Sequence, residues 1–271
     1  MRVEFDDVTV TLAGRDVVQH ASLTAESGHV VGLVGPNGSG KSSLLRALYR
    51  AVKPRHGRCT VDGVDVQHLT GRQAARAVAV MLQDPSSDFD LSVEETIMLG
   101  RIPHHTSIGG DTLHDLDVAV GAMRLTETTD LASRMVATLS GGQRQRVMLA
   151  RALTQESPVM VLDEPSNHLD ISHQHELLST VRGLGRTVVV ALHDLNLATQ
   201  YCDHIVVLDA GRIVATGPPQ QVLSPELIRA TFRIDVQVLG DAGAPVFAFR
   251  RLDSHAATPS AIPSPESSIR R

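Results

Sequence analysis

Eight consecutive residues, Gly35-Pro36-Asn37-Gly38-Ser39-Gly40-Lys41-Ser42, fit the pattern G-x-x-x-x-G-K-[ST] and organise the rest of the chain. The apolar residues 30–34 before them suit a buried strand, and residues 43–48 suit the start of a helix. This order predicts a loop whose backbone N–H groups surround a phosphate at the positive end of a helix. Lys41 is then expected on the β- and γ-phosphates, and the Ser42 hydroxyl on Mg²⁺. A glycine-rich turn before an ordinary helix is the alternative.

Length and composition limit the class of protein. With 271 residues, of which 42% are hydrophobic, the chain can form one large domain or two small ones. A net charge of −5 and an aromatic content of 3% without Trp argue against nucleic acid as a partner. The sequence has no apolar run of bilayer-spanning length, its N-terminus lacks a signal-peptide core, and its two cysteines suit a reduced cytosolic compartment.

Strand and helix signals alternate through most of the chain, which predicts an α/β fold with a mainly parallel sheet. Short strands before residue 26 and a hairpin at residues 58–66 predict an antiparallel unit attached to that sheet. Residues 84–157 carry helix caps but no strand signal, so we expect a helical insert there. The pattern weakens after Gly240, and residues 254–271 are rich in Ser, Pro and Ala, which predicts disorder.

An apolar strand at residues 159–162 ends in two carboxylates, Asp163 and Glu164. The strand end places Asp163 beside the phosphate loop, where it can hold Mg²⁺ through water. Glu164 projects differently and can act as the general base for an attacking water. A strand that runs into an acidic turn is an equally common explanation of this pattern.

The stretch Leu139-Ser140-Gly141-Gly142-Gln143 precedes a predicted helix. Ser and Gly leave backbone N–H groups open at the helix start, which makes a second anion site. One nucleotide does not need two γ-phosphate sites, so we expect the second site to serve a neighbouring subunit. An ordinary helix cap of the Ser-x-x-Gln type is the alternative.

These motifs, in this order, resemble those of the nucleotide-binding subunits of ABC transporters. Further matching motifs are Gln83, Ser166-Asn167-His168-Leu169-Asp170, and His193 after its strand. The resemblance covers roughly residues 3–240. It implies a RecA-like P-loop NTPase core sheet with an N-terminal antiparallel β subdomain. The ATPase domain would be residues 1–240, with the helical subdomain inserted at about 84–157, and residues 241–271 would form a C-terminal extension.

The resemblance also implies ATP and Mg²⁺ as cofactors, and it implies roles for individual residues. Glu164, His193 and Gln83 would be catalytic, His193 by contacting the γ-phosphate and Gln83 by contacting Mg²⁺ or the attacking water. The metal ligands would be Ser42, Gln83 and Asp163.

A homodimer of head-to-tail subunits is implied as well. Ser140, Gly141, Gly142 and Gln143 of one subunit would close on ATP bound to the other, and Asp170 would help to link the two sites. Family members usually carry an adenine-stacking aromatic residue near the first strand, at or near Leu12 in this sequence. Leucine can pack on the base but cannot stack, so weaker nucleotide binding is expected.

Further stretches, at residues 89–93, 99–104, 193–198 and 217–227, resemble the importers of iron–siderophore, haem and cobalamin. This implies an ATPase on the cytoplasmic face of the membrane that drives uptake through integral permease subunits. The surface at residues 83–104 would contact the permease, and a substrate-binding protein would take part indirectly. The alternatives are an ATPase for another solute or for export, and a soluble ABC ATPase outside transport.

Overall fold

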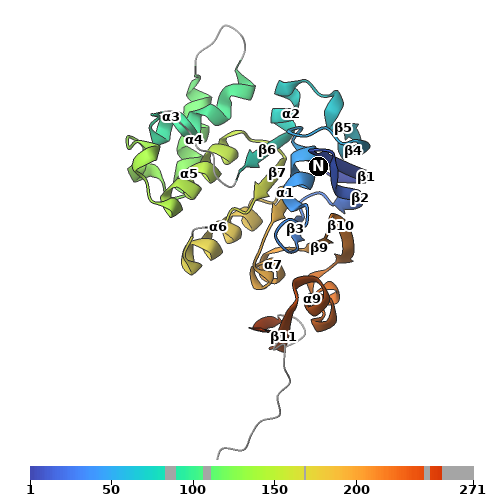
Figure 1. Ribbon diagram of the computed structural model, residues 1–271. Helices are drawn as coiled ribbons and strands as arrows, with labels where there is room; N and C mark the ends of the chain where they lie inside the picture. Colours follow the sequence, from blue (N-terminus) through green and yellow to red (C-terminus); the bar gives the residue numbers. More distant parts are fainter. Residues whose placement is uncertain (83–89, 106–110, 168, 241–244, 252–271) are drawn as a thin grey trace, which may run out of the picture.

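The computed structural model describes residues 1–82, 90–105, 111–167, 169–240 and 245–251 (Figure 1). Its centre is a six-stranded sheet of order β10-β9-β3-β8-β7-β6. Neighbouring strands from β9 to β6 run parallel, and β10 joins β9 antiparallel, which confirms the predicted sheet. The strands are β3 (Val30–Val34), β6 (Val78–Met81), β7 (Val159–Asp163), β8 (Thr187–Ala191), β9 (His204–Asp209) and β10 (Arg212–Gly217).

Every residue of β3, β7 and β8 is buried, because both faces of the sheet are covered. Val31 and Leu33 pack towards α1 (Lys41–Leu48) and the N-terminal strands. Val30 and Val34 pack on the opposite face, which is covered by α5 (Gly141–Thr154), α6 (Ile171–Gly183) and α7 (Leu195–Tyr201). The two-sided burial explains why these strands read as unbroken apolar runs.

A four-stranded antiparallel sheet of order β2-β1-β4-β5 confirms the predicted N-terminal unit. Its β4–β5 hairpin turns at Asp62 and Gly63, both with positive φ, as the sequence predicts. Two short helices, η1 and α2, then lead into β6. The elements of this part are β1 (Val3–Leu12), β2 (Arg15–Ala25), β4 (His56–Val61), β5 (Val64–Asp65), η1 (Val66–His68) and α2 (Gly71–Ala77).

The insert between β6 and β7 is helical within its described residues, as predicted (Figure 1). Capping boxes begin α3, α4 and α5 at Ser92, Thr112 and Ser140. These local hydrogen bonds explain why the helix starts could be read from sequence. Besides α5, the insert contains α3 (Val93–Met98), η2 (Leu99–His104), α4 (Leu113–Leu125), η3 (Thr129–Leu131) and η4 (Val136–Thr138).

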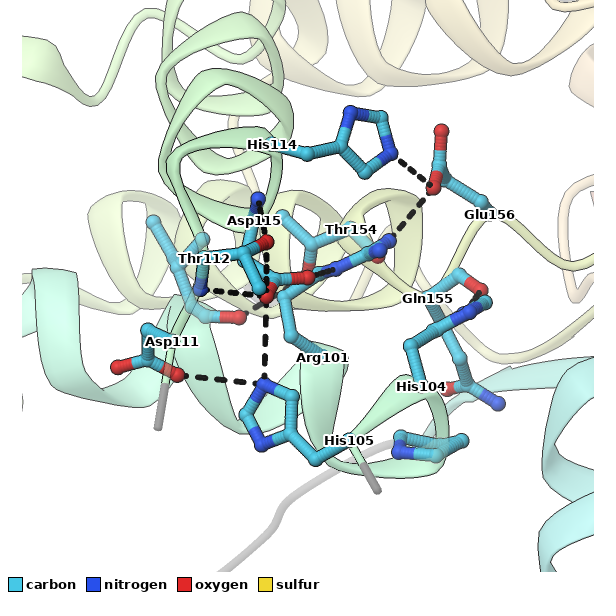
Figure 2. A network of polar contacts seen from close by, with 12 residues as sticks. Arg101, His104, His105, Asp111, Thr112, His114, Asp115, Thr154, Gln155 and Glu156 are labelled. Carbon is cyan, nitrogen blue, oxygen red and sulfur yellow. Dashed lines mark hydrogen bonds and ion pairs between the residues drawn. The ribbon is translucent and has the colours of Figure 1, made fainter. Parts of the chain in front are cut away.

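A buried charge network joins three parts of this insert (Figure 2). The Arg101 guanidinium, in η2, donates to Asp115 Oδ1 at 2.7 Å, to the Thr154 carbonyl oxygen at 2.8 Å and to Glu156 Oε2 at 2.6 Å. Hydrogen bonds from Thr112, supported by Arg101, hold the pKa of Asp115 well below its usual range. The network therefore fixes η2 to the start of α4 and to the end of α5.

The C-terminal extension contains a strand that the weak sequence pattern after Gly240 does not mark. Residues after Gly240 include β12 (Val246–Arg251), which pairs with β11 (Ile234–Leu239) and is held by Asn196. The Asn196 side chain donates to the Phe247 carbonyl at 3.1 Å and accepts from its N–H at 2.7 Å. This contact joins residues that are far apart in the chain, so the local sequence carries no signal for it. The predicted disorder at 254–271 lies outside the described residues, and the remaining elements are α8 (Pro219–Val222) and α9 (Pro225–Phe232).

Two further observations complete the fold. The helix after the phosphate loop ends at Leu48, because Arg50 has a left-handed φ of 65° and cannot continue it. Within the described ranges, no helix combines the length and the apolar composition that crossing a bilayer requires.

Candidate nucleotide-binding site

The phosphate loop connects β3 to α1 through backbone conformations that only glycine adopts readily. Gly35 has a φ of 153°, and a Cβ atom there would lie 2.1 Å from the Leu208 carbonyl oxygen of β9. Gly40 has a φ of 105°, and its Cβ atom would lie 2.7 Å from the Val17 carbonyl oxygen of β2. Glycine at these positions therefore lets the loop pass between the two sheets without a clash.

Lys41, the first residue of α1, is 4% exposed. Its ammonium donates to the carbonyl oxygens of Gly35 at 2.8 Å and Pro36 at 3.2 Å. Burial lowers the pKa of Lys41, and the carboxylates of Glu164 and Asp163 oppose that shift. The side chain is thus a buried cation wrapped by the loop, at the place where the sequence predicts a phosphate.

The Ser42 hydroxyl donates to Asp163 Oδ1 at 2.8 Å, across residues far apart in sequence. Asp163 ends β7 and is buried; that burial raises its pKa, and the Ser42 hydrogen bond opposes the rise. A hydroxyl and a carboxylate are the oxygen ligands that Mg²⁺ prefers. The pair therefore fits the predicted metal, whereas Gln83, the third predicted ligand, lies outside the described residues.

Glu164 is held by three contacts. Its N–H donates to the Ala191 carbonyl oxygen at 3.2 Å, Asn167 Nδ2 donates to its Oε2 at 2.7 Å, and His193 Nε2 pairs with its Oε1. Because β7 and β8 are parallel neighbours, the residues that follow them meet at one edge of the sheet. Glu164 also has a left-handed φ of 53°, which turns the chain directly after β7.

Lys41, Ser42 and Glu164 border a hollow of about 230 Å³. Ser39 Oγ is buried there without a hydrogen-bond partner among the described residues, so the loop offers a polar atom that nothing in the protein satisfies. A phosphate oxygen is an acceptor for such a hydroxyl. The lining consists of Val17, Asn37, Gly38, Ser39, Gly40, Lys41, Ser42, Ser43 and Glu164.

The second predicted anion site stands apart from the first. Ser140 caps α5, where its Oγ accepts from the Gln143 N–H at 3.3 Å, and Ser140 and Gly141 are exposed. Gly142 faces Leu169, whose Cδ2 would lie 3.3 Å from a Cβ atom added to the glycine. The described lining of the phosphate-loop hollow includes none of residues 140–143. Within one chain, the two motifs are therefore separate.

Asp170 and Leu12 lie at the edges of this arrangement. Asp170 is exposed and caps α6, where its carboxylate accepts from the His173 N–H at 3.0 Å. Leu12 ends β1, pairs with Arg15 in the hairpin and is partly exposed. The described lining of the hollow includes one residue of the N-terminal sheet, which is Val17 and not Leu12.

Sequence reasoning missed two functional candidates, Asn167 and Val17. Asn167 was recognised only as part of a motif, and its hydrogen bond to Glu164 depends on the strained turn between them. Val17 reads only as a strand residue. Ser39 belongs to the predicted phosphate loop, but the burial of its hydroxyl without a hydrogen-bond partner among the described residues appears only in three dimensions.

Comparison with known proteins agrees with this geometry. A sequence model of the ABC transporter family matches residues 18–167. The chain is 44% identical to the cobalamin import ATP-binding protein BtuD of Halobacterium salinarum over 242 residues, which are 88% of this chain and 60% of that relative. It thus spans less than two thirds of the halobacterial protein's length.

Two other relatives match over most of their length. The chain is 37% identical to the ferric enterobactin transport ATP-binding protein FepC of Escherichia coli, covering 90% of this chain and 93% of FepC. It is 43% identical to the hemin import ATP-binding protein HmuV of Pseudomonas entomophila, covering 82% and 89% of the two chains. An inward-facing transporter described as of the metal-chelate type superposes with a TM-score of 0.79 at 26% identity, covering 93% and 98%. The chain therefore belongs to the ABC transporter family.

Proposed function

We propose that this chain hydrolyses ATP to power the import of a ferric siderophore, haem or cobalamin through a membrane permease. One observation carries the hydrolytic part: a buried lysine, a hydroxyl–carboxylate pair and a clamped glutamate converge on one edge of the sheet. The cargo class is supported by relatives between 37% and 44% identical that are named for cobalamin import, ferric enterobactin transport and hemin import.

In the proposed reaction, water attacks the γ-phosphorus of ATP, and the bond from this phosphorus to the β–γ bridging oxygen breaks, so that ADP and phosphate are released. Lys41 and the loop N–H groups hold the phosphates, and Glu164 accepts the proton of the attacking water. His193 and Asn167 fix the glutamate carboxylate in place for that step. Mg²⁺, held by Ser42, Asp163 and Gln83, would neutralise phosphate charge when bound.

We further propose that two copies associate head to tail. Ser140 and Gly141 are exposed, Gly142 and Gln143 are partly exposed, and all four lie apart from the phosphate-loop hollow, so a second copy can supply them to ATP bound on the first. Asp170 directly follows Leu169 in sequence, and Leu169 faces Gly142. Asp170 would therefore help to link the two sites. In this head-to-tail dimer, bound ATP forms part of the interface, so the dimer is complete only when ATP is bound.

The chain would work as a peripheral subunit on the cytoplasmic face of the membrane. Permease subunits would contact it directly, and an extracytoplasmic binding protein would act through them. The ATP-binding relatives named for import support this assignment.

Uptake by proteoliposomes that contain the chain and the permease of its own system tests the proposal. Labelled ferric siderophore, haem and cobalamin are offered separately, with Glu164→Gln as the inactive control. We expect ATP-dependent uptake of one of these three cargos, and none with the variant. ATP hydrolysis without uptake of any of the three would favour the alternatives of another solute or export.

A further inference from the structure

Two hairpin turns of this protein have nearly the same backbone conformation but different surroundings. The β4–β5 turn consists of Asp62 and Gly63, with φ of 46° and 77°, and the β9–β10 turn consists of Ala210 and Gly211, with φ of 45° and 81°. Two successive residues with positive φ form the turn in each case. Gly63 is exposed, and a Cβ atom there would meet nothing within 4 Å among the described residues. Gly211, in contrast, is buried.

Gly211 lies where three segments of backbone meet. A Cβ atom on Gly211 would lie 2.8 Å from the Val17 carbonyl oxygen of β2, and a Cβ atom on Gly40 of the phosphate loop would lie 2.7 Å from that same oxygen. The atom added to Gly40 would also lie 3.7 Å from the Gly211 Cα atom. The phosphate loop, β2 and the β9–β10 turn therefore approach one another so closely that neither glycine has room for a side chain.

Two backbone hydrogen bonds hold the turn in this junction. The Gly211 N–H donates to the Ser39 carbonyl oxygen of the phosphate loop at 3.0 Å, and the Gly211 carbonyl oxygen accepts from the Gln19 N–H of β2 at 2.7 Å. A single residue thus joins the phosphate loop to the N-terminal sheet. Beside it, the Arg212 guanidinium donates to Gln19 Oε1 at 2.6 Å. Figure 1 shows β10 next to β2 at this place.

The junction lies directly behind the nucleotide hollow. Val17, Ser39 and Gly40 line that hollow, and its described lining does not include Gly211. Gly211 therefore acts on the hollow through residues that it contacts. Because these contacts are made with main-chain atoms, they fix where the backbone of β2 lies relative to the backbone of the phosphate loop.

The preference of hairpin turns for glycine explains only part of this arrangement. It accounts for glycine at both 63 and 211, since the two residues have similar φ. It does not account for the burial of Gly211, for its close approach to Val17, or for its hydrogen bonds to the phosphate loop and to β2.

We infer that Gly211 is a positioning residue for nucleotide binding, which holds β2 against the phosphate loop and so fixes Val17 relative to Ser39. The inference rests on the proposed function, because the hollow must bind ATP for this position to matter. A methyl group at residue 211 has to push β2 away or lift the turn off Ser39. Either displacement changes the walls of the hollow and weakens their contacts with bound nucleotide.

The chemical step should be affected much less than binding. The contacts that hold Glu164, the proposed base, come from Ala191, Asn167 and His193, and none of the three lies in the β9–β10 turn. A displaced turn therefore leaves the base in place. This separates the role of Gly211 from a general loss of folding, which would lower affinity and turnover together.

The test compares Gly211→Ala with Gly63→Ala in the full chain. Gly63 is the matched control, because alanine meets the same left-handed φ there but no close neighbour among the described residues. Calorimetric titration with Mg²⁺ and the β,γ-imido analogue of ATP, which is not hydrolysed, gives the Kd. Phosphate release gives KM and kcat, and the Tm of each variant shows that it is folded.

We expect Gly211→Ala to raise both the Kd and the KM at least about fivefold, the effect of forcing an extra methyl group into a tight contact. Its kcat at saturating ATP should stay within about twofold of wild type. Gly63→Ala should leave the Kd, the KM and kcat unchanged.

The Gln19 side chain provides a second test that adds no bulk at the junction. Gln19→Ala removes the acceptor for Arg212 and should raise the Kd about two- to fivefold, the range of an exposed polar pair. Gln19→Glu keeps an acceptor for Arg212 and should restore the wild-type Kd.

A Gly211→Ala chain that binds the analogue as tightly as Gly63→Ala would overturn the inference. So would a fall in kcat at an unchanged Kd, or a Gln19→Glu chain as weak as Gln19→Ala. These results leave the proposed function standing, because the wild-type chain still binds nucleotide. If the wild-type chain itself binds no ATP analogue, the proposed function fails, and the inference fails with it.

Discussion

Replacing Glu164 with glutamine keeps the shape of the side chain and removes the carboxylate that we assign as the base. The carboxylate pairs with His193 Nε2 and accepts from Asn167 Nδ2 at 2.7 Å. A glutamine carbonyl oxygen can still accept from Asn167, so folding and ATP binding should remain close to wild type. General-base catalysis contributes roughly 10²–10⁴-fold, which corresponds to about 3–5 kcal/mol of the barrier. We therefore expect kcat to fall at least about 100-fold.

Phosphate release at saturating ATP and Mg²⁺ measures kcat, and equilibrium dialysis measures the Kd for ATP. Glu176→Gln is the matched control, since Glu176 is an exposed α6 carboxylate that accepts from Ser172 Oγ at 3.1 Å. A kcat for Glu164→Gln within about threefold of wild type would refute the assignment of the base. A large loss of ATP affinity would instead show that Glu164 contributes to ATP binding.

Three further changes test the rest of the site. Lys41→Ala should raise the Kd for ATP by about 10–150-fold, the worth of a hydrogen bond to a charged group, in calorimetric titration; an unchanged Kd would contradict the phosphate-loop assignment. Leu12→Tyr should tighten ATP binding at least about fivefold if adenine passes over that residue, because stacking is worth roughly 1–3 kcal/mol; no change would place the base elsewhere. Burial raises the pKa of Asp163 above 3.8, so its contribution to stability is full below pH 3.8 and is lost as pH rises through the folded-state pKa. Asp163→Asn should therefore raise the Tm of the nucleotide-free protein at pH 8, and by less at pH 4; an equal gain at both pH values would contradict the titration.

Much of the fold is predictable from sequence because its signals are local. The strands at β3, β7 and β8 are buried on both faces and read as apolar runs, and the helix starts at Ser92, Thr112 and Ser140 carry their own capping partners. The phosphate loop is also local, because its glycines and Lys41 are adjacent in the chain. These elements can therefore be predicted without knowledge of tertiary contacts.

The remaining features depend on contacts between distant residues. Asn196 holds Phe247 across 51 positions, and Arg101 reaches Thr154 and Glu156 across more than 50. No periodicity or spacing rule marks such pairs, because their side chains are brought together by packing of the whole sheet and its insert.

The central claim is that the phosphate loop forms half of a site that a second copy completes. Light scattering of the Glu164→Gln chain, with and without ATP, measures this directly, because the variant should bind ATP without consuming it. We predict a monomer of 29.1 kDa without nucleotide and twice that mass with ATP. We also predict that Ser140→Arg, at an exposed position outside the hollow of its own chain, prevents the ATP-dependent dimer. A chain that stays monomeric at saturating ATP, or dimerises equally well with Ser140→Arg, would contradict the account.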